Sequence, residues 1–141
     1  MELSDKLYSK ITSLCEAGDE YCEKEQYEKA IKKYKSALKL IPEPKYDWEA
    51  STWVYVAIGD SFYMLDQYTD ALNNFLESLK CPDGNTNPFI LLRLGECYYE
   101  LGNFEQAKEY LLRAFMWEEG EDIFDGEDEK YFALIKDMVN Q

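Results

Sequence analysis

Residues 17–37 read AGDEYCEKEQYEKAIKKYKSA, and this stretch carries the pattern that decides the fold. Gly18 is followed by Tyr21 three residues later, by Tyr27 nine residues later and by Ala30 twelve residues later. A large apolar residue stands four positions after that alanine, and a small residue seven positions after it. Because side chains three or four residues apart share a helix face, the spacing predicts two consecutive helices that pack together.

The same pattern occurs twice more along the chain, so the sequence contains an internal repeat. The matched positions are Gly18/Gly59/Gly95, Tyr21/Phe62/Tyr98, Tyr27/Tyr68/Phe104, Ala30/Ala71/Ala107, Tyr34/Phe75/Leu111 and Ala37/Ser78/Ala114. A glycine inside a helix costs about 1 kcal/mol relative to alanine, which indicates a close helix–helix approach with no room for a side chain. Each unit is therefore predicted to be an antiparallel helix pair that buries its apolar face against the next pair.

This pattern resembles the tetratricopeptide-repeat (TPR) family, and the resemblance covers about residues 11–120. It implies an all-α fold, a right-handed superhelical stack of three TPR helix hairpins with a C-terminal capping helix. We expect one TPR domain over residues 1–141, with repeats at about 11–44, 45–85 and 86–120, an acidic linker at 118–130 and the capping helix at about 128–139.

The spacing between the repeats is irregular. The repeat alanines are 41 and then 36 residues apart, whereas the TPR motif is about 34 residues long. The first excess predicts that the first helix of the second repeat starts early, near Lys45, and overhangs its neighbours by about two turns. The second excess falls at residues 81–88, where Asn87 suits a helix N-cap and Pro88 suits the first helical position.

The charge is strongly negative and uneven. The net charge is −14, and because residues 1–45 carry nine lysines and nine acids, all of the excess lies in residues 46–141. This distribution argues against nucleic-acid binding, which needs a basic patch. It favours a basic protein partner, although acidity also serves solubility alone. No apolar run approaches the length of a membrane span, so we expect no membrane insertion.

Catalytic and metal-binding residues are not evident in the sequence. The chain has no histidine, and its four cysteines have no CxxC spacing. The usual general base and the usual zinc-ligand patterns are therefore missing. We expect no enzyme activity, no cofactor and no metal, and a reduced, cytoplasmic protein that is a monomer or a weak homodimer.

The TPR resemblance implies a concave groove lined by the first helix of each repeat. Carried over by register, the groove is aromatic and acidic, and Trp48 is a further contact on the predicted overhang. The candidate partner-binding residues are Asp19, Glu23, Trp48, Trp53, Asp60, Tyr63, Phe89, Glu96, Tyr99 and Glu100. These positions lack the Lys, Arg and Asn with which some TPR grooves clamp a carboxylate.

Other interpretations of these residues stay open at this point. The acids can form a solvated face, and the aromatic residues can be core residues or be buried under the terminal helices. Trp48 can pack under the N-terminal helix. The groove can also be occupied by the protein's own C-terminal helix.

Three segments resemble small bacterial TPR proteins encoded beside polymorphic (contact-dependent or Rhs-type) toxins. They are PKYDWEASTW at 44–53, NPFILLRLG at 87–95 and EGEDIFDGEDEKYF at 119–132. The resemblance implies an immunity protein that neutralises a cognate toxin domain, and a basic toxin domain suits the acidic surface. The alternative is a secretion chaperone or assembly adaptor that holds an extended peptide in the groove.

Overall fold

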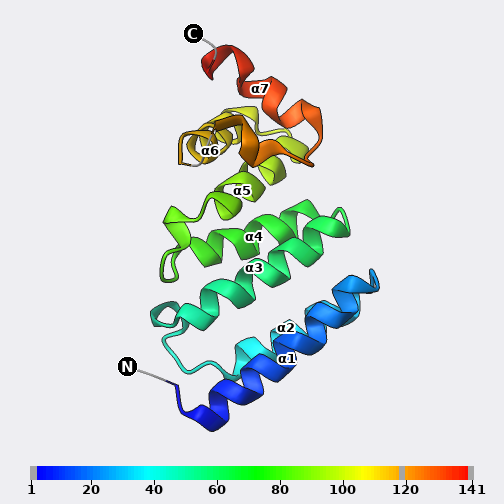
Figure 1. Cartoon of the computed structure of the whole chain (residues 1–141), viewed down its shortest axis with the longest axis vertical. Coiled ribbons are helices and arrows are strands. Elements are labelled where there is room, and N and C mark those ends of the chain that lie inside the picture. The colour runs from blue at the N-terminus through cyan, green and yellow to red at the C-terminus, as the bar shows by residue number, and fades with distance from the viewer. Residues whose placement is uncertain (1–2, 118–119, 140–141) are drawn as a thin grey trace.

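The computed structural model describes residues 3–117 and 120–139, and all of its regular structure is helical. Figure 1 shows the helices as a stack that rises from the N-terminus to the C-terminus. The elements are α1 (Asp5–Glu23), α2 (Tyr27–Leu40), the 3-10 turn η1 (Lys45–Asp47), α3 (Glu49–Met64), α4 (Tyr68–Leu79), η2 (Gly84–Thr86), α5 (Pro88–Glu100), α6 (Phe104–Trp117), η3 (Gly120–Phe124) and α7 (Glu129–Val139).

Three helix pairs form the body of the stack, as the repeated pattern predicts. They are α1 with α2, α3 with α4, and α5 with α6, and each pair packs on the next (Figure 1). The repeat alanines Ala30, Ala71 and Ala107 are fully buried, because the second helix of each pair lies against the first at these positions. The predicted all-α superhelical stack is therefore confirmed.

The glycines allow the two helices of a pair to approach closely. A Cβ atom added to Gly18 would lie 2.5 Å from the Tyr34 ring, and one added to Gly95 would lie 2.6 Å from Cγ of Leu111. Non-bonded carbon atoms prefer separations of about 3.5–4.0 Å. The large apolar residue of the second helix therefore fills the space that a side chain at the glycine would need.

The connection between the first two pairs differs from the prediction. Residues 45–47 form the separate turn η1, and α3 begins only at Glu49. Trp48, between them, has an extended backbone, and its side chain is buried in the core with Ile41 and Val54. The predicted two-turn overhang is thus wrong. The helix does not extend back to Lys45, because Trp48 adopts an extended backbone between η1 and α3 with its indole in the core.

The connection between the second and third pairs follows the prediction. Oδ1 of Asn87 accepts hydrogen bonds from the backbone N–H groups of Phe89 (2.9 Å) and Ile90 (3.4 Å). Pro88 is the first residue of α5, where the missing N–H is not needed. The N-cap therefore fixes the start of α5, the helix that carries Arg93.

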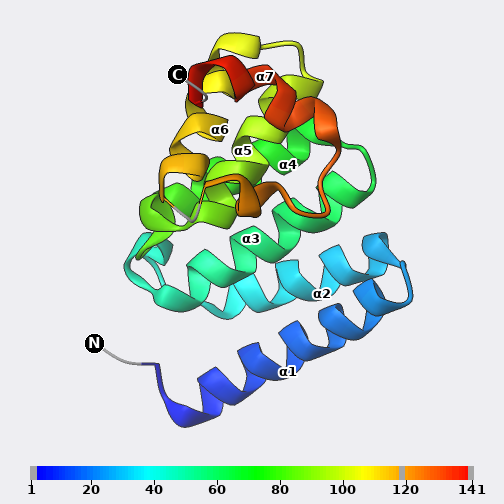
Figure 2. The same ribbon diagram turned by 45° about the horizontal axis from the view of Figure 1, so that its top comes forward.

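The C-terminal segment, residues 120–139, covers the end of the stack. Phe124, Tyr131 and Ile135 are buried against α5 and α6, and Figure 2 shows the orange and red segment crossing over these helices. α7 confirms the capping helix, whereas part of the predicted acidic linker is the helical turn η3. Residues 118–119 of that linker, and residues 1–2 and 140–141 of the predicted domain, lie outside the described residues. None of the described helices combines the length and the apolar character that crossing a membrane requires.

Candidate functional site

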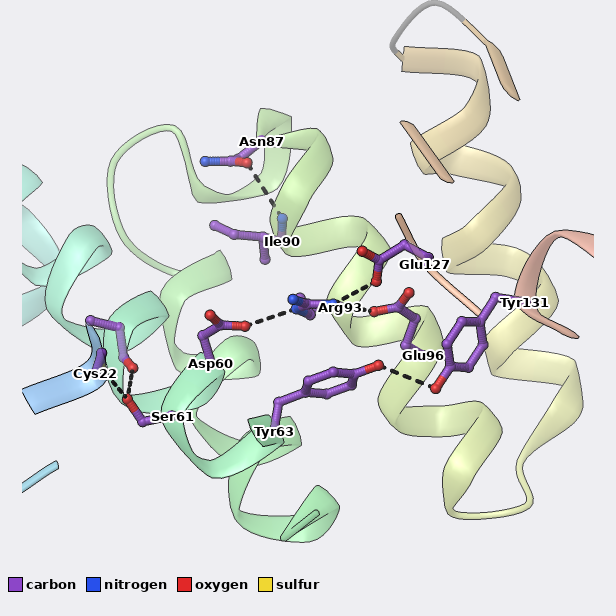
Figure 3. Close-up of polar contacts among 11 residues, drawn as sticks. Cys22, Asp60, Ser61, Tyr63, Asn87, Ile90, Arg93, Glu96, Glu127 and Tyr131 are labelled. Carbon is purple, nitrogen blue, oxygen red and sulfur yellow. Dashed lines mark hydrogen bonds and ion pairs between the residues drawn. The ribbon is translucent and has the colours of Figure 1, made fainter. Parts of the chain in front are cut away.

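Arg93 of α5 is the centre of a charged cluster that joins three parts of the chain (Figure 3). Its Nε donates to Oδ1 of Asp60 on α3 at 2.8 Å. Its Nη1 donates to Oε1 of Glu96 and to Oε1 of Glu127, both at 2.7 Å. The side chain of Arg93 is only 11% exposed. One guanidinium group therefore ties α3 and α5 to the segment that leads into α7.

Two aromatic rings enclose the same guanidinium group. Cζ of Arg93 lies 4.2 Å from the ring centroid of Tyr63 and 4.9 Å from that of Phe89. A cation over an aromatic face is attracted to the ring, most strongly where water is excluded. The site thus combines acidic partners with aromatic walls, which is the chemistry that best retains an arginine.

Glu96 is the most buried member of the cluster, with a fully buried side chain whose Oε2 has no hydrogen-bond partner in the described chain. Burial, reinforced by the nearby carboxylate of Glu127, raises the pKa of Glu96 to about 9, although Arg93 opposes this shift. Loss of solvation disfavours the charged form of a carboxyl group. We therefore expect Glu96 to be protonated at neutral pH, so that one positive charge faces two carboxylates.

The C-terminal segment fills the groove of the third repeat. The Tyr131 hydroxyl lies 3.2 Å from the Tyr63 hydroxyl, and the Tyr131 ring meets the Tyr99 ring edge-on with centroids 5.3 Å apart. Nζ of Lys130 donates to Oε1 of Glu100 at 2.7 Å. In this half of the groove, the residues predicted to contact a partner therefore contact the chain's own C-terminal segment instead.

The structure divides the predicted contact residues into three groups. Tyr63, Phe89, Tyr99 and Glu100 contact Arg93 or the C-terminal segment, and Asp60 is paired with Arg93. The assignment of Trp48 and Glu96 to a partner surface is wrong, because their side chains are 8% and 0% exposed and lie inside the protein. The exposed residues of the set are Asp19, Glu23 and Trp53.

An open cavity of about 390 Å³ lies between α1 and α3. Its lining residues are Tyr8, Ile11, Thr12, Cys15, Glu16, Asp19, Glu49, Ala50, Trp53 and Val54. Tyr8 and Trp53 are each 58% exposed. Of the predicted contact residues, the structure brings Asp19 and Trp53 together here, whereas Glu23 lies at the end of α1 outside the lining. Among residues 3–117 and 120–139, no segment fills this part of the groove.

Asp19 is held in place by a neighbouring tyrosine. The hydroxyl group of Tyr34 donates to Oδ1 of Asp19 at 2.5 Å, and burial together with this bond raises the pKa of Tyr34. No lysine or arginine of residues 3–117 and 120–139 forms a salt bridge with Asp19. Its carboxylate therefore remains available to a positively charged ligand.

Several residues of the cavity and of the Arg93 cluster were not identified from the sequence, among them Tyr8, Glu16, Glu49, Arg93, Glu127 and Tyr131. Arg93 has a recognisable signal, because it is the sole basic residue between Lys80 and Lys108 and interrupts an apolar run. Glu127 sits in an acidic run without a distinguishing neighbour, so its role depends on how the C-terminal segment folds back. In the described part of the chain, no group of three or more potential ligand side chains is placed to hold a metal ion.

Comparison with known proteins supports a repeat architecture. Residues 18–43 match the TPR repeat family and residues 88–120 match the tetratricopeptide repeat family. A search of curated protein sequences found no match.

Solved structures with the same fold include several TPR domains. The C-terminal TPR-containing domain of an FK506-binding protein from Plasmodium falciparum is 20% identical, with a TM-score of 0.76, covering 99% of this chain and 95% of that one. The first TPR of Spaghetti (RPAP3) bound to the HSP90 peptide SRMEEVD is 15% identical, with a TM-score of 0.72 and coverage of 93% and 97%. PcrH in complex with the chaperone binding region of PopB is 17% identical, with a TM-score of 0.70 and coverage of 94% and 97%. At these identities the likeness concerns the fold alone.

Proposed function

We propose that this chain, which carries tetratricopeptide repeats and has the TPR fold, binds a basic partner protein through the open groove between α1 and α3. The observation that carries the proposal is the α1–α3 cavity, where the exposed rings of Tyr8 and Trp53 stand beside the carboxyl groups of Glu16, Asp19 and Glu49. Aromatic side chains with a charged surround are typical of binding hot spots. Two structural neighbours hold peptide or protein segments, which supports a binding role for this fold.

The charge of the open groove favours a basic partner. Three acids line the cavity, namely Glu16, Asp19 and Glu49, and none of the ten lining residues is basic. The whole chain adds a net charge of −14. Opposite potentials accelerate encounter and disfavour acidic competitors. Nucleic acid is repelled by the same field, so a protein is the expected ligand.

The closed half of the groove favours a folded partner over a long extended peptide. Glu127 and Tyr131 occupy the groove at the third repeat, so an extended chain cannot run its whole length in this conformation. A short protruding element of a folded domain fits the space between α1 and α3. We therefore favour an immunity protein that neutralises a cognate bacterial toxin domain. We place it in the cytoplasm, which accords with its four free thiols.

A secretion chaperone or assembly adaptor is the second candidate. PcrH, which shares the fold, is seen with the chaperone binding region of PopB. For this chain to hold a comparable extended segment, residues 127–131 must leave the groove and release Arg93. The two functions therefore differ in whether the C-terminal segment moves when the partner binds.

The test uses the proteins encoded by the two genes that flank this one. Each is co-expressed with the chain in a bacterial host, and binding is measured by isothermal titration calorimetry. An immunity protein restores growth to cells that express its toxic neighbour and binds it in a one-to-one complex. An adaptor binds an unstructured segment of its partner. Hydrogen exchange in its own residues 127–131 then increases, because these residues leave the groove.

Two tryptophan variants locate the contact. Trp53 and Trp117 are equally exposed, at 58%, but only Trp53 lines the cavity. We expect Trp53→Ala to weaken binding at least tenfold, which corresponds to about 1.4 kcal/mol, and Trp117→Ala to change it less than twofold. Equal effects of the two substitutions would show that the cavity is not the contact surface, and binding by neither flanking protein would contradict the proposal.

A further inference from the structure

The repeat register relates the enclosure of Arg93 to an equivalent position one repeat earlier. Arg93 stands two residues before Gly95, and Phe89, one of its aromatic walls, stands six residues before that glycine. The acid Asp60 stands one residue after Gly59, in the preceding repeat. These offsets from the repeat glycines describe how one arginine is held between two successive first helices.

The same offsets applied between α1 and α3 give part of an arginine site without the arginine. The position of Tyr63, four residues after its glycine, is Cys22 in the first repeat, so one of the two aromatic walls is absent. Trp53 stands six residues before Gly59, where Phe89 stands in the next repeat. Asp19 stands one residue after the first repeat glycine, in the place of Asp60. The residue two before Gly59 is Ala57, which has no charge. An aromatic wall and an acid are therefore kept, while the guanidinium group is missing.

The two retained residues border open space. Trp53 and Asp19 both line the cavity of about 390 Å³, and Glu16 and Glu49 add two further carboxylates to it. The Tyr34 hydroxyl fixes the Asp19 carboxylate, as described above. Around Arg93, by contrast, Asp60, the acid equivalent to Asp19, is already paired.

We infer that the α1–α3 cavity receives an arginine side chain of the partner, whose guanidinium group lies on the Trp53 ring and pairs with Asp19. This inference rests on the proposed function, because it specifies the chemistry by which the basic partner is recognised. Tryptophan is the strongest cation–π acceptor, and the planar guanidinium group suits a carboxylate beside an aromatic face better than an ammonium group does. The chain's own Arg93 provides the internal precedent, with Tyr63 and Phe89 as its walls.

The test measures binding of a minimal probe to the ¹⁵N-labelled chain by nuclear magnetic resonance. The probe is N-acetyl-arginine methylamide, and its uncharged counterpart is N-acetyl-citrulline methylamide. The chain has three tryptophans, so the indole N–H signals separate the cavity residue Trp53 from the buried Trp48 and the exposed Trp117. We expect a saturable shift of the Trp53 signal with the arginine probe in the millimolar range. The citrulline probe is expected to produce no such shift.

Two substitutions test the geometry. Asp19→Asn changes an exposed carboxylate to a neutral group of the same shape and is expected to weaken the arginine probe at least fivefold. Ala57→Arg supplies an internal arginine at the position equivalent to Arg93, and we expect it to abolish the saturable shift. Circular dichroism checks that each variant is folded. If Ala57→Arg fails to fold, the Asp19→Asn result alone decides the question.

The results separate this inference from the proposed function. Equal shifts with the arginine and citrulline probes, or unchanged binding in Asp19→Asn, would overturn the arginine site. If a flanking protein still bound, and Trp53→Ala still weakened that binding, the proposed function would stand without the arginine site. Conversely, the Trp53 signal could shift with the arginine probe alone while neither flanking protein binds. That result would support the arginine site and contradict the proposed partner.

Discussion

Replacement of Arg93 by methionine tests whether the charged cluster holds the C-terminal segment on the stack. Methionine keeps a long unbranched side chain but removes the three hydrogen bonds to Asp60, Glu96 and Glu127. It also removes the cation–π contact with Tyr63. The carboxylates then remain close together without a positive charge between them.

The exposure of each partner sets the expected size of the effect. Removing one member of a buried ion pair costs about 3–5 kcal/mol, because the other member is left uncompensated. Asp60 is 37% exposed, so water compensates much of its loss. Glu96 is 0% exposed but is already protonated at neutral pH, so the loss of Arg93 leaves no buried charge there, which also reduces the cost. We therefore expect a loss of about 3 kcal/mol, which lowers Tm by about 6–12 °C for a domain of this size.

The assay combines urea denaturation with hydrogen exchange. Exchange in residues 123–139 is expected to rise in Arg93→Met, because the contact between Glu127 and α5 is gone. Because Glu96 is already neutral, adding Glu96→Gln to the Arg93→Met chain is expected to change stability at neutral pH by less than about 1 kcal/mol. A loss below about 1 kcal/mol, with unchanged exchange in the C-terminal segment, would refute the role of Arg93 in holding that segment on the stack.

Three further substitutions test other parts of the structure. Gly95→Ala is expected to cost about 1–3 kcal/mol by overpacking, since the added methyl group meets Leu111, and urea denaturation that shows no loss would contradict the close approach. The raised pKa of Glu96, about 9 against an ordinary 4.5, means that the folded chain keeps a proton that the unfolded chain releases above about pH 4.5. The free energy of unfolding should therefore fall as pH rises from about 4.5 to about 9, by up to about 1.4 kcal/mol per pH unit, and Glu96→Gln should flatten this slope; identical Tm–pH curves would argue against a buried neutral acid. Asn87→Ala removes the N-cap of α5 and is expected to cost about 1 kcal/mol in thermal unfolding, with no change expected if solvent caps the helix equally well.

The periodic part of the fold is predictable because its determinants are local and repeated. Gly18 and Tyr34 lie 16 residues apart, and their close approach recurs in each helix pair at the same spacing. The cap at Asn87 is equally local, since its oxygen reaches N–H groups only two and three residues ahead. In patterns of this kind both contacting residues lie within one short stretch of sequence, so they can be recognised without the tertiary structure.

The site is less predictable because its determinants are distant in sequence. Tyr63 meets Tyr131 across 68 residues, and Arg93 meets Glu127 across 34. No periodic pattern predicts that an acidic segment after the last repeat turns back into the groove. Trp48 shows the opposite error, because a large aromatic residue beside a proline-rich connection looks like a surface contact but completes the core.

The Arg93 cluster and the α1–α3 cavity are completed at different times during synthesis of the chain. The walls of the α1–α3 cavity come from residues 8–54, whereas the Arg93 cluster requires Glu127, which emerges 73 residues after Val54. During synthesis the N-terminal portion of a chain leaves the ribosome first. The cavity walls are therefore synthesised before Glu127, and until Glu127 emerges Arg93 has only Asp60 and Glu96 as acidic neighbours. An acidic segment of another polypeptide that met the chain at that stage would find the place of Glu127 beside Arg93 vacant.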